Sequence, residues 1–269
     1  MPSLPLRLVV HGAAGRMGQR VIAGALAEPG QWRLVAALER TGHPRCGVDA
    51  GGLAGCAAAG ITVADSWEGP ADVVVDFSLP EAVAGIVSTC VAKHVPLVVA
   101  TTGLTVGDHD RIAEAARVIP VLQSPSMSLA VNISMDLVGR AATLLARVGG
   151  RTDVEILECH HRHKEDAPSG TALKFGSIIR DVMGQVREAH GREGRPGARP
   201  ADEIGYHAIR AGDNPGEHTI LFGMEGESFA VNVRATNRDC YARGALAAAA
   251  FLAGRPAGLY SMRDVLGLS

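Results

Sequence analysis

A short segment of the chain concentrates side chains that donate protons and hold anions. Residues 158–172 read ECHHRHKEDAPSGTA, so three histidines, an arginine and a lysine fall within five consecutive positions. A histidine can donate a proton near neutral pH, because its unperturbed pKa is about 6.5. The turn Pro168-Ser169-Gly170-Thr171 then opens a helix-like run, whose first backbone N–H groups can hold an anion. This combination is typical of an enzyme site for a small, multiply charged carboxylate.

Two other interpretations compete with a catalytic role for this segment. Cys159, His160, His161 and His163 are ligand types that zinc accepts. Neighbours on an extended strand point to opposite faces, however, so His160 and His161 cannot easily share one ion, and no HExxH or clustered CxxC pattern is present. We therefore expect no metal site. The other alternative is a solvated basic loop, the usual fate of a charge run.

A glycine-rich loop lies near the N-terminus. Gly12-Ala13-Ala14-Gly15-Arg16-Met17-Gly18 follows a strand-like run and opens a helix-like one. In this GxxGxxG variant of the dinucleotide fingerprint, the glycines permit a tight turn and close approach of the backbone to a pyrophosphate. Glu39 follows the second strand and is suited to ribose hydroxyls, and Arg40 to a 2′-phosphate. The pair predicts use of both NADH and NADPH, the alternative being a solvated strand end.

Two later turns fit the same site. Residues 100–103 and 124–127 each follow a strand-like run, at the edge where doubly wound sheets bind ligands, although plain turns would look alike. The predicted cofactor-binding residues are Gly12, Ala13, Ala14, Gly15, Arg16, Met17, Glu39, Arg40, Ala100, Thr101, Thr102, Ser124, Pro125, Ser126 and Met127.

The elements that must position these residues fall into two halves. The first half alternates apolar strand-like runs with helix-like ones, which predicts an α/β fold with a Rossmann-type, doubly wound parallel sheet. Strands are expected at residues 6–10, 33–38, 72–77, 96–100 and 120–122, and helices at 15–27, 80–93 and 108–118.

The second half predicts an inserted α+β domain. Helices are expected at residues 133–147, 171–182 and 242–253, and strands at 153–159, 205–210, 218–223 and 228–234, with a polar loop at 190–201. The run Gly212-Asp213-Asn214-Pro215-Gly216 looks like a hairpin connection, which suggests a mixed or antiparallel sheet.

Composition narrows the classes of function. A net charge of −2 and 4% aromatic residues give no footprint for nucleic acid. The five cysteines are odd in number and lack CxxC spacing, which indicates free thiols in a reducing cytoplasm. The first residues make a poor signal peptide, and no apolar run approaches the roughly 20 residues of a membrane span, so no membrane partner is expected.

With these residues in hand, the chain resembles the 4-hydroxy-tetrahydrodipicolinate reductase (dihydrodipicolinate reductase) family from Val10 to Leu266. The block that carries most of the resemblance is HHxxKxDAPSGTA at residues 160–172, which is highly specific. The other matching segments are residues 12–18, 37–40, 76–81, 101–103, 192–194, 210–213, 216–219 and 262–266.

The resemblance implies reduction at C4 of an unsaturated cyclic dicarboxylate with loss of the 4-hydroxyl as water, in the cytoplasmic diaminopimelate route to lysine. It implies His160 as proton donor and Lys164 as the second catalytic residue. The residues that it implies for the substrate carboxylates are His161, Lys164, Ser169, Gly170 and Thr171.

The same resemblance implies a domain plan. Residues 1–127 and 238–269 would form the cofactor domain, and residues 128–237 an inserted substrate domain whose mixed sheet assembles a homotetramer. Three positions depart from the family pattern, with Ala100 in place of the first glycine of GTTG, Ser126 where asparagine is frequent, and Ala130 where glycine is common. These departures concern the nicotinamide-side contacts rather than the chemistry.

Two rival functions remain open at this stage. Another two-domain dehydrogenase, related to aspartate or homoserine dehydrogenases, would need a cysteine nucleophile or a different lysine pair, and neither is evident. A non-catalytic NAD(P)-sensing protein would leave the proton donors and the anion-holding turn unexplained.

Overall fold

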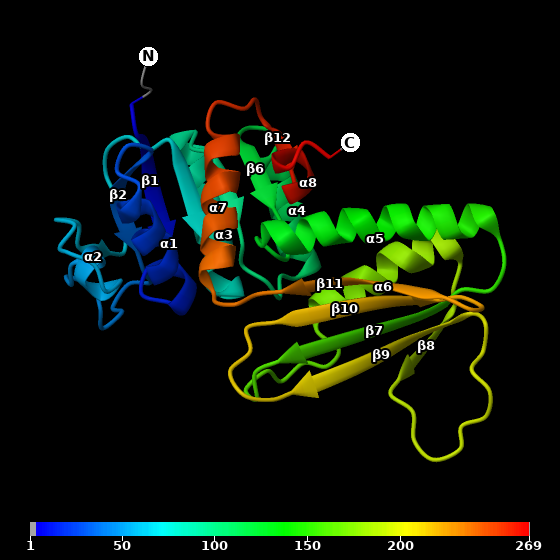
Figure 1. The fold of residues 1–269 in the computed structure, drawn as a ribbon. Helices are drawn as coiled ribbons and strands as arrows, with labels where there is room; N and C mark the ends of the chain where they lie inside the picture. Colours follow the sequence, from blue (N-terminus) through cyan, green and yellow to red (C-terminus); the bar gives the residue numbers. More distant parts are fainter. Residues whose placement is uncertain (1–3, 269) are drawn as a thin grey trace. The chain divides into compact units, whose positions relative to one another are not determined.

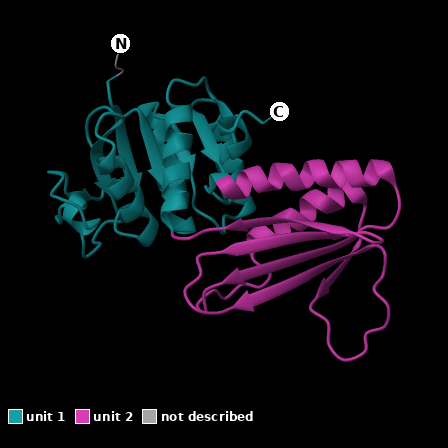
Figure 2. Cartoon of the chain, in the orientation of Figure 1, with its two compact units in different colours: residues 1–129, 238–269 teal, residues 130–237 magenta. Residues whose placement is uncertain are grey.

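The computed structural model describes residues 4–268 (Figure 1). The chain divides into two compact units. Unit 1 comprises residues 1–129 and 238–269, and unit 2 comprises residues 130–237 (Figure 2). The chain therefore leaves the first unit once and returns to it, so that unit 2 is an insertion.

Unit 1 is built on a seven-stranded sheet with the order β12-β6-β5-β4-β1-β2-β3. Every pairing in it is parallel. The predicted doubly wound parallel sheet is confirmed. Its strands are β1 (Leu6–His11), β2 (Trp32–Leu38), β3 (Val63–Ala64), β4 (Val73–Asp76), β5 (Leu97–Val99), β6 (Pro120–Gln123) and β12 (Gly258–Tyr260).

Helices pack on both faces of this sheet, as continuous apolar strands require. Leu8 and Val10 face α1 (Arg16–Ala27) and α7 (Asp239–Leu252), whereas Val9 faces the cluster that holds α3 (Pro80–Lys93) and α4 (Val106–Ala115). Successive side chains of β1 point to opposite faces of the sheet, so they enter the two apolar cores in alternation. The short helices α2 (Ala50–Leu53) and α8 (Met262–Val265) complete the unit.

Unit 2 contains a five-stranded mixed sheet with the order β11-β10-β7-β9-β8. The parallel pairs are β7 with β9 and β8 with β9, and β10 is antiparallel to both β7 and β11. The mixed sheet that was predicted is confirmed. The strands are β7 (Asp153–His160), β8 (Arg187–His190), β9 (Glu203–Arg210), β10 (Glu217–Gly223) and β11 (Ser228–Arg234), and the helices are α5 (Leu129–Val148) and α6 (Gly170–Met183).

One expectation for this sheet was wrong. Residues 212–216 do not close a hairpin, because β7 lies between the two strands that they join, β9 and β10. The connection must therefore cross the end of β7, and the backbone bonds to it there. The N–H of His161 donates to the carbonyl of Asn214 at 2.8 Å, and the N–H of Ala211 donates to that of His160 at 3.0 Å. This crossing fixes the backbone of the histidine segment.

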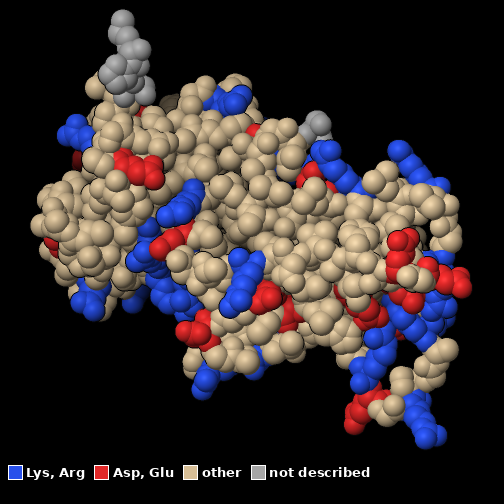
Figure 3. Space-filling model, in the orientation of Figure 1, with Lys and Arg blue, Asp and Glu red and all other residues tan. Residues whose placement is uncertain are grey.

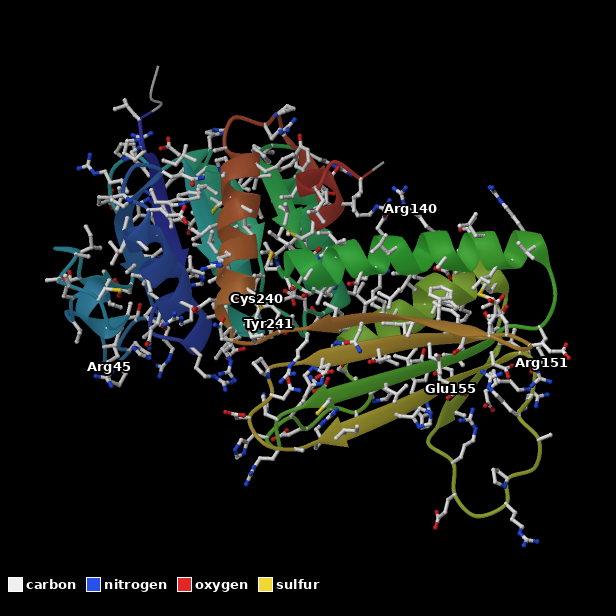
Figure 4. The ribbon with its side chains drawn as sticks, viewed as in Figure 1. Arg45, Arg140, Arg151, Glu155, Cys240 and Tyr241 are labelled. Atoms are coloured by element: carbon white, nitrogen blue, oxygen red, sulfur yellow. The ribbon has the colours of Figure 1, made fainter. Side chains whose placement is uncertain are left out.

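The two faces of the mixed sheet differ. Val154, Ile156 and Phe222 face the helices α5 and α6 in an apolar core. On the other face, Glu155 accepts hydrogen bonds from Arg192, Arg199 and His207 at 2.7–2.9 Å. Glu155 is labelled in Figure 4, near Arg151 at one end of unit 2. Burial alone would raise the pKa of Glu155, but these donors outweigh it and lower the pKa to about 2. The network ties the polar loop at residues 191–202 to the sheet.

Helix α5 departs from the expectation that no segment is long enough for a membrane. It has 20 residues and a mean hydropathy of 1.3 in its most apolar window, which suffices by length and composition. A single such helix is weak evidence, since core helices pass the same test. Here Val131, Val138 and Ala142 are buried in the core of unit 2, and Leu144 on another face is exposed.

We expect Gly244→Ala to destabilise unit 1 by about 1–3 kcal/mol, because overpacking displaces its surroundings. A Cβ at Gly244 would lie 1.6 Å from the backbone oxygen of Met127. Urea unfolding of the full chain measures the effect. Gly85→Ala in α3 is the matched control, since its Cβ would meet nothing within 4 Å, and it should leave stability unchanged or raise it by up to about 1 kcal/mol. Equal midpoints for Gly244→Ala and the wild type would contradict the packing described.

Candidate active site

Unit 1 brings the predicted cofactor-binding residues to one edge of its sheet. Because the strands are parallel, their carboxyl ends lie at the same edge. Residues 12–17 follow β1, residues 39–40 follow β2, residues 100–102 follow β5 and residues 124–127 follow β6. Residues up to 115 positions apart in the sequence thus gather where doubly wound sheets bind ligands.

The backbone packs so closely around Gly12 and Gly18 that neither position has room for a side chain. Gly12 has φ +75°, and a Cβ there would lie 2.5 Å from the backbone oxygen of Phe77. A Cβ on Gly18 would lie 2.1 Å from the backbone oxygen of Gly12. Helix α1 begins after Gly15, which offers no side-chain cap. The first N–H groups of α1 are therefore left to hold an anion.

Glu39 and Arg40 lie beside this loop. The Oε1 of Glu39 accepts a hydrogen bond from the N–H of Ala14 at 2.9 Å, which ties the end of β2 to the loop. Both residues line a cavity of about 340 Å³, together with Trp67 and Lys93. The cavity therefore presents carboxylate, guanidinium and aromatic groups within unit 1.

A buried carboxylate beneath the same edge was not foreseen. Asp76 ends β4 and is fully buried. It accepts a hydrogen bond from the hydroxyl of Thr101 at 2.7 Å, and its other oxygen lies 2.7 Å from Nδ1 of His11. The hydroxyl of Thr101, a residue predicted for the cofactor, is therefore already engaged. The N–H of Ala100 also donates to the backbone oxygen of Asp76 at 2.9 Å, whereas Thr102 is exposed. The sequence signal for Asp76 is a charged residue that closes a run of three valines.

In unit 2, the strand β7 places two ionisable groups in line. Val154, Ile156, Glu158 and His160 are all buried, as the period of two along the strand requires. The Nδ1 of His160 hydrogen-bonds to Oε2 of Glu158. A proton-transfer group therefore ends the strand, with a carboxylate directly behind it.

Neighbouring strands complete the surroundings of Glu158. Arg210, which pairs with His160 in the register of β9, donates from Nη1 to Oε2 at 2.8 Å and from Nη2 to Oε1 at 2.7 Å. Burial would raise the pKa of Glu158, but the hydrogen bonds from Arg210 and His160 outweigh it and lower the pKa below its usual value. Burial lowers the pKa of His160, and Glu158 opposes that shift only in part.

A second histidine lies against the first. His218, opposite Glu158 in the register of β10, has its ring centroid 5.1 Å from that of His160, edge to face. Its Nε2 lies 3.0 Å from the hydroxyl oxygen of Ser169. Burial, followed by the nearby His160, lowers the pKa of His218 to about 4, so it is neutral at pH 7.

Some polar groups at the start of α6 already have hydrogen-bond partners within the protein. The N–H of Ser169 donates to Oε1 of Glu158 at 3.1 Å, and its hydroxyl accepts from the N–H of Ala172 at 3.2 Å as the helix N-cap. The first-turn N–H groups of Gly170 and Thr171 have no partner within the helix and are available to a ligand. Of the predicted Ser169-Gly170-Thr171 cradle, the groups nearest solvent therefore belong to the last two residues.

The remaining predicted residues lie on the loop between β7 and α6. Lys164 is paired with Asp166, its Nζ lying 2.7 Å and 2.9 Å from the two carboxylate oxygens. The ring of His161 lies 6.2 Å from that of His163. Unit 2 thus gathers His160, His161, Lys164 and the start of α6 on one short segment. Within residues 4–268, no group of three or more His, Cys, Asp or Glu side chains is arranged to hold a metal.

In unit 2, the site residues that the sequence did not predict are Glu158, Arg210 and His218. Glu158 carries a readable signal, since it follows Val154 and Ile156 in the inward positions of its strand, where an apolar residue would be expected. Arg210 and His218 lie 52 and 60 residues further along the chain, and only the strand order brings them to Glu158.

Comparison with known proteins identifies the family. Two protein-family models match the sequence. The family model described as "Dihydrodipicolinate reductase, N-terminus" matches residues 6–127, and the family model described as "Dihydrodipicolinate reductase, C-terminus" matches residues 130–266. The 4-hydroxy-tetrahydrodipicolinate reductase of Rhodopirellula baltica is 55% identical over 98% of this chain and 97% of its own length. That of Anaeromyxobacter dehalogenans is 45% identical over 97% of this chain and 98% of its own.

A solved structure shares the fold. The dipicolinate-bound dihydrodipicolinate reductase from Paenisporosarcina sp. superposes with a TM-score of 0.76 at 24% identity, covering 97% of this chain and 98% of that one. The family models span both units, and relatives at 55% and 45% identity align almost end to end. The chain therefore belongs to the dihydrodipicolinate reductase family.

Proposed function

We propose that this protein reduces 4-hydroxy-tetrahydrodipicolinate to tetrahydrodipicolinate with NADH or NADPH, releasing water, in the diaminopimelate route to lysine. The observation that carries the proposal is the segment from His160 to Thr171. It combines a buried histidine at a strand end, a lysine and the N–H groups of a helix start within twelve residues. A cyclic dicarboxylate needs a proton donor and anion-holding groups together.

The cofactor would bind at the carboxyl edge of unit 1. The fit rests on the uncapped start of α1 and on the Gly12–Gly18 loop, where a Cβ would meet backbone. When bound, the nicotinamide supplies the hydride that C4 of the substrate ring receives. The N–H groups of Arg16 and Met17 at the start of α1 would hold the pyrophosphate, because those of residues 12–15 already bond within unit 1. Residues 100–102 and 124–127 would lie on the nicotinamide side.

Catalysis by unit 2 follows from its own residues. His160 donates the proton that the reduced ring requires, and Lys164 offsets the negative charge of the substrate. His161, Lys164 and the turn Ser169-Gly170-Thr171 form the site for the two carboxylates. Because the N–H and hydroxyl of Ser169 already have partners, Gly170 and Thr171 make the direct contacts and Ser169 fixes the turn.

We expect His160→Asn and Lys164→Met to lower turnover by roughly 10²–10⁴-fold, the usual worth of a positioned proton donor or charge, while cofactor affinity stays near that of the wild type. The assay follows NAD(P)H oxidation with the condensation product of aspartate semialdehyde and pyruvate. His163→Asn is the matched control, since His163 is an exposed histidine of the same segment. Wild-type turnover in either site variant would refute its role, and a wild-type chain inactive with both cofactors would refute the reductase assignment.

We further propose that Glu39 and Arg40 let the enzyme use both cofactors. Dissociation constants for NADH and NADPH should lie within a hundredfold of each other. Arg40→Ala should weaken NADPH binding by about 10–100-fold, the range of a charge-assisted hydrogen bond, and leave NADH binding nearly unchanged. Arg45→Ala, an exposed arginine of the same region, is the control. An equal loss for both cofactors in Arg40→Ala would contradict this assignment.

A homotetramer assembled through the open face of the mixed sheet is also proposed. Leu157 and Ile209 are exposed on this face, at 36% and 49%, and the face opposite carries α5 and α6. Sedimentation equilibrium should give about four times 27.9 kDa. Leu157→Glu should lower that mass, and Leu259→Glu, an exposed leucine of unit 1, should not. A monomeric wild type at assay concentrations would rule the tetramer out.

We place the enzyme in the cytoplasm, because it would draw on the NAD(P)H pool there. No disulfide joins the five cysteines, all of which lie among the described residues. Acidic and basic side chains both occur on the face drawn in Figure 3. Fractionation of the source cells tests the location.

A further inference from the structure

Glu158 is surrounded by hydrogen-bond donors. Its side chain is 1% exposed. Oε2 meets Nδ1 of His160 and, at 2.8 Å, Nη1 of Arg210. Oε1 accepts from Nη2 of Arg210 at 2.7 Å and from the N–H of Ser169 at 3.1 Å. Three N–H donors from Arg210 and Ser169 are aimed at it, two of them from a positively charged guanidinium, and they favour the ionised carboxylate, which can only accept.

This arrangement decides where His160 keeps its proton. A neutral imidazole has one N–H and one bare nitrogen, and the hydrogen bond of one nitrogen selects the tautomer. An ionised Glu158 can only accept, so Nδ1 of His160 must carry the hydrogen. Nε2 is then the bare nitrogen, free to gain a proton from solvent and to give it up.

The other titratable and charged groups near His160 are consistent with a hydrogen on Nδ1 and a bare Nε2. His218, packed edge-on from β10, is neutral at pH 7 and hydrogen-bonds to Ser169. Lys164 from the loop and Arg210 from β9 bring positive charge, and Asp166 is occupied by Lys164. Glu158 is the carboxylate in contact with the ring.

We propose that Glu158 is a positioning residue that holds one hydrogen on Nδ1 of His160, so that Nε2 is the atom that delivers the catalytic proton. In the proton-transfer step, the Nε2–H bond of the imidazolium breaks and the proton bonds to the reduced ring. The electron pair stays on the imidazole, which returns to its neutral form with the hydrogen on Nδ1. The proposal rests on the function assigned above to His160.

Glu158→Gln tests this with little change in shape. The amide NH₂ would face either His160 and Arg210 or Ser169 and Arg210, and each orientation sets a donor against a donor. In the first orientation, the conflict with His160 is relieved when the ring releases the hydrogen from Nδ1 and carries it on Nε2, whereas the conflict with Arg210 remains. The variant should therefore shift the neutral ring toward the other tautomer.

The direct measurement uses the wild-type, full-length protein without ligand. The ¹⁵N chemical shifts of the His160 ring, assigned by their loss in His160→Gln, are read above the pH at which the ring becomes neutral. The expected result is a protonated Nδ1 and a bare Nε2. Finding the hydrogen on Nε2 in the wild type would overturn the proposal, whatever the folding of any variant.

Kinetics provide the second readout. Glu158→Gln should lower kcat on the order of 10²-fold, change KM little, and displace the pH profile of kcat. Glu188→Gln removes a carboxylate that pairs with Arg180 elsewhere in unit 2, and should leave both constants and the profile unchanged. A kcat within about twofold of the wild type in folded Glu158→Gln would overturn the positioning role.

The two readouts separate this inference from the proposed function. If the wild-type chain reduces no dicarboxylate but the ring carries its hydrogen on Nδ1, the function fails and the placement of the proton by Glu158 holds. If the enzyme is active and the hydrogen is on Nε2, the function holds and the inference fails.

Discussion

The arrangement of unit 2 depends on the burial of one ionised carboxylate. Removing Glu158 from water would cost several kcal/mol if it were left unpaired, and the fold offsets this with donors from three separate elements. These are the end of β7, the guanidinium of Arg210 on β9 and the backbone at the start of α6. Each donor can reach the carboxylate only when its element is in place, so satisfying Glu158 also sets the register of His160 and the position of the α6 turn.

Unit 1 uses the same device at a different edge. Asp76, fully buried at the end of β4, gathers His11 from β1, Thr101 from the turn after β5 and the N–H of Ser78. In both units a buried acid at a strand end orders the loops around it, while the groups left for a ligand are backbone N–H groups and the outer side chains. This explains why the hydroxyl of Thr101 and the backbone N–H of Ser169, both in functional motifs, bond inward.

Much of this organisation could be predicted from the sequence. The runs of valine and leucine at β1, β4 and β5 predicted the parallel sheet, and the Gly12–Gly18 loop and the histidine segment lie at the strand ends expected of them. The elements that were missed, α2, β3, β8, β12 and α8, have two to four residues, too few for a period to show. The prediction of a hairpin at residues 212–216 was wrong. The composition of a turn indicates that the chain changes direction, but it does not indicate which strands pair with each other.

The sequence alone therefore determined the fold class, the family and the short segments that carry the chemistry, because each is written in adjacent residues or in a local period. Only the tertiary structure decided which groups within those segments remain available. The insertion of β7 between β9 and β10 brings Arg210 and His218 to Glu158 across more than fifty residues. Strand order follows from how apolar faces and buried charges are satisfied together, and that balance is a property of the packed chain rather than of any one segment.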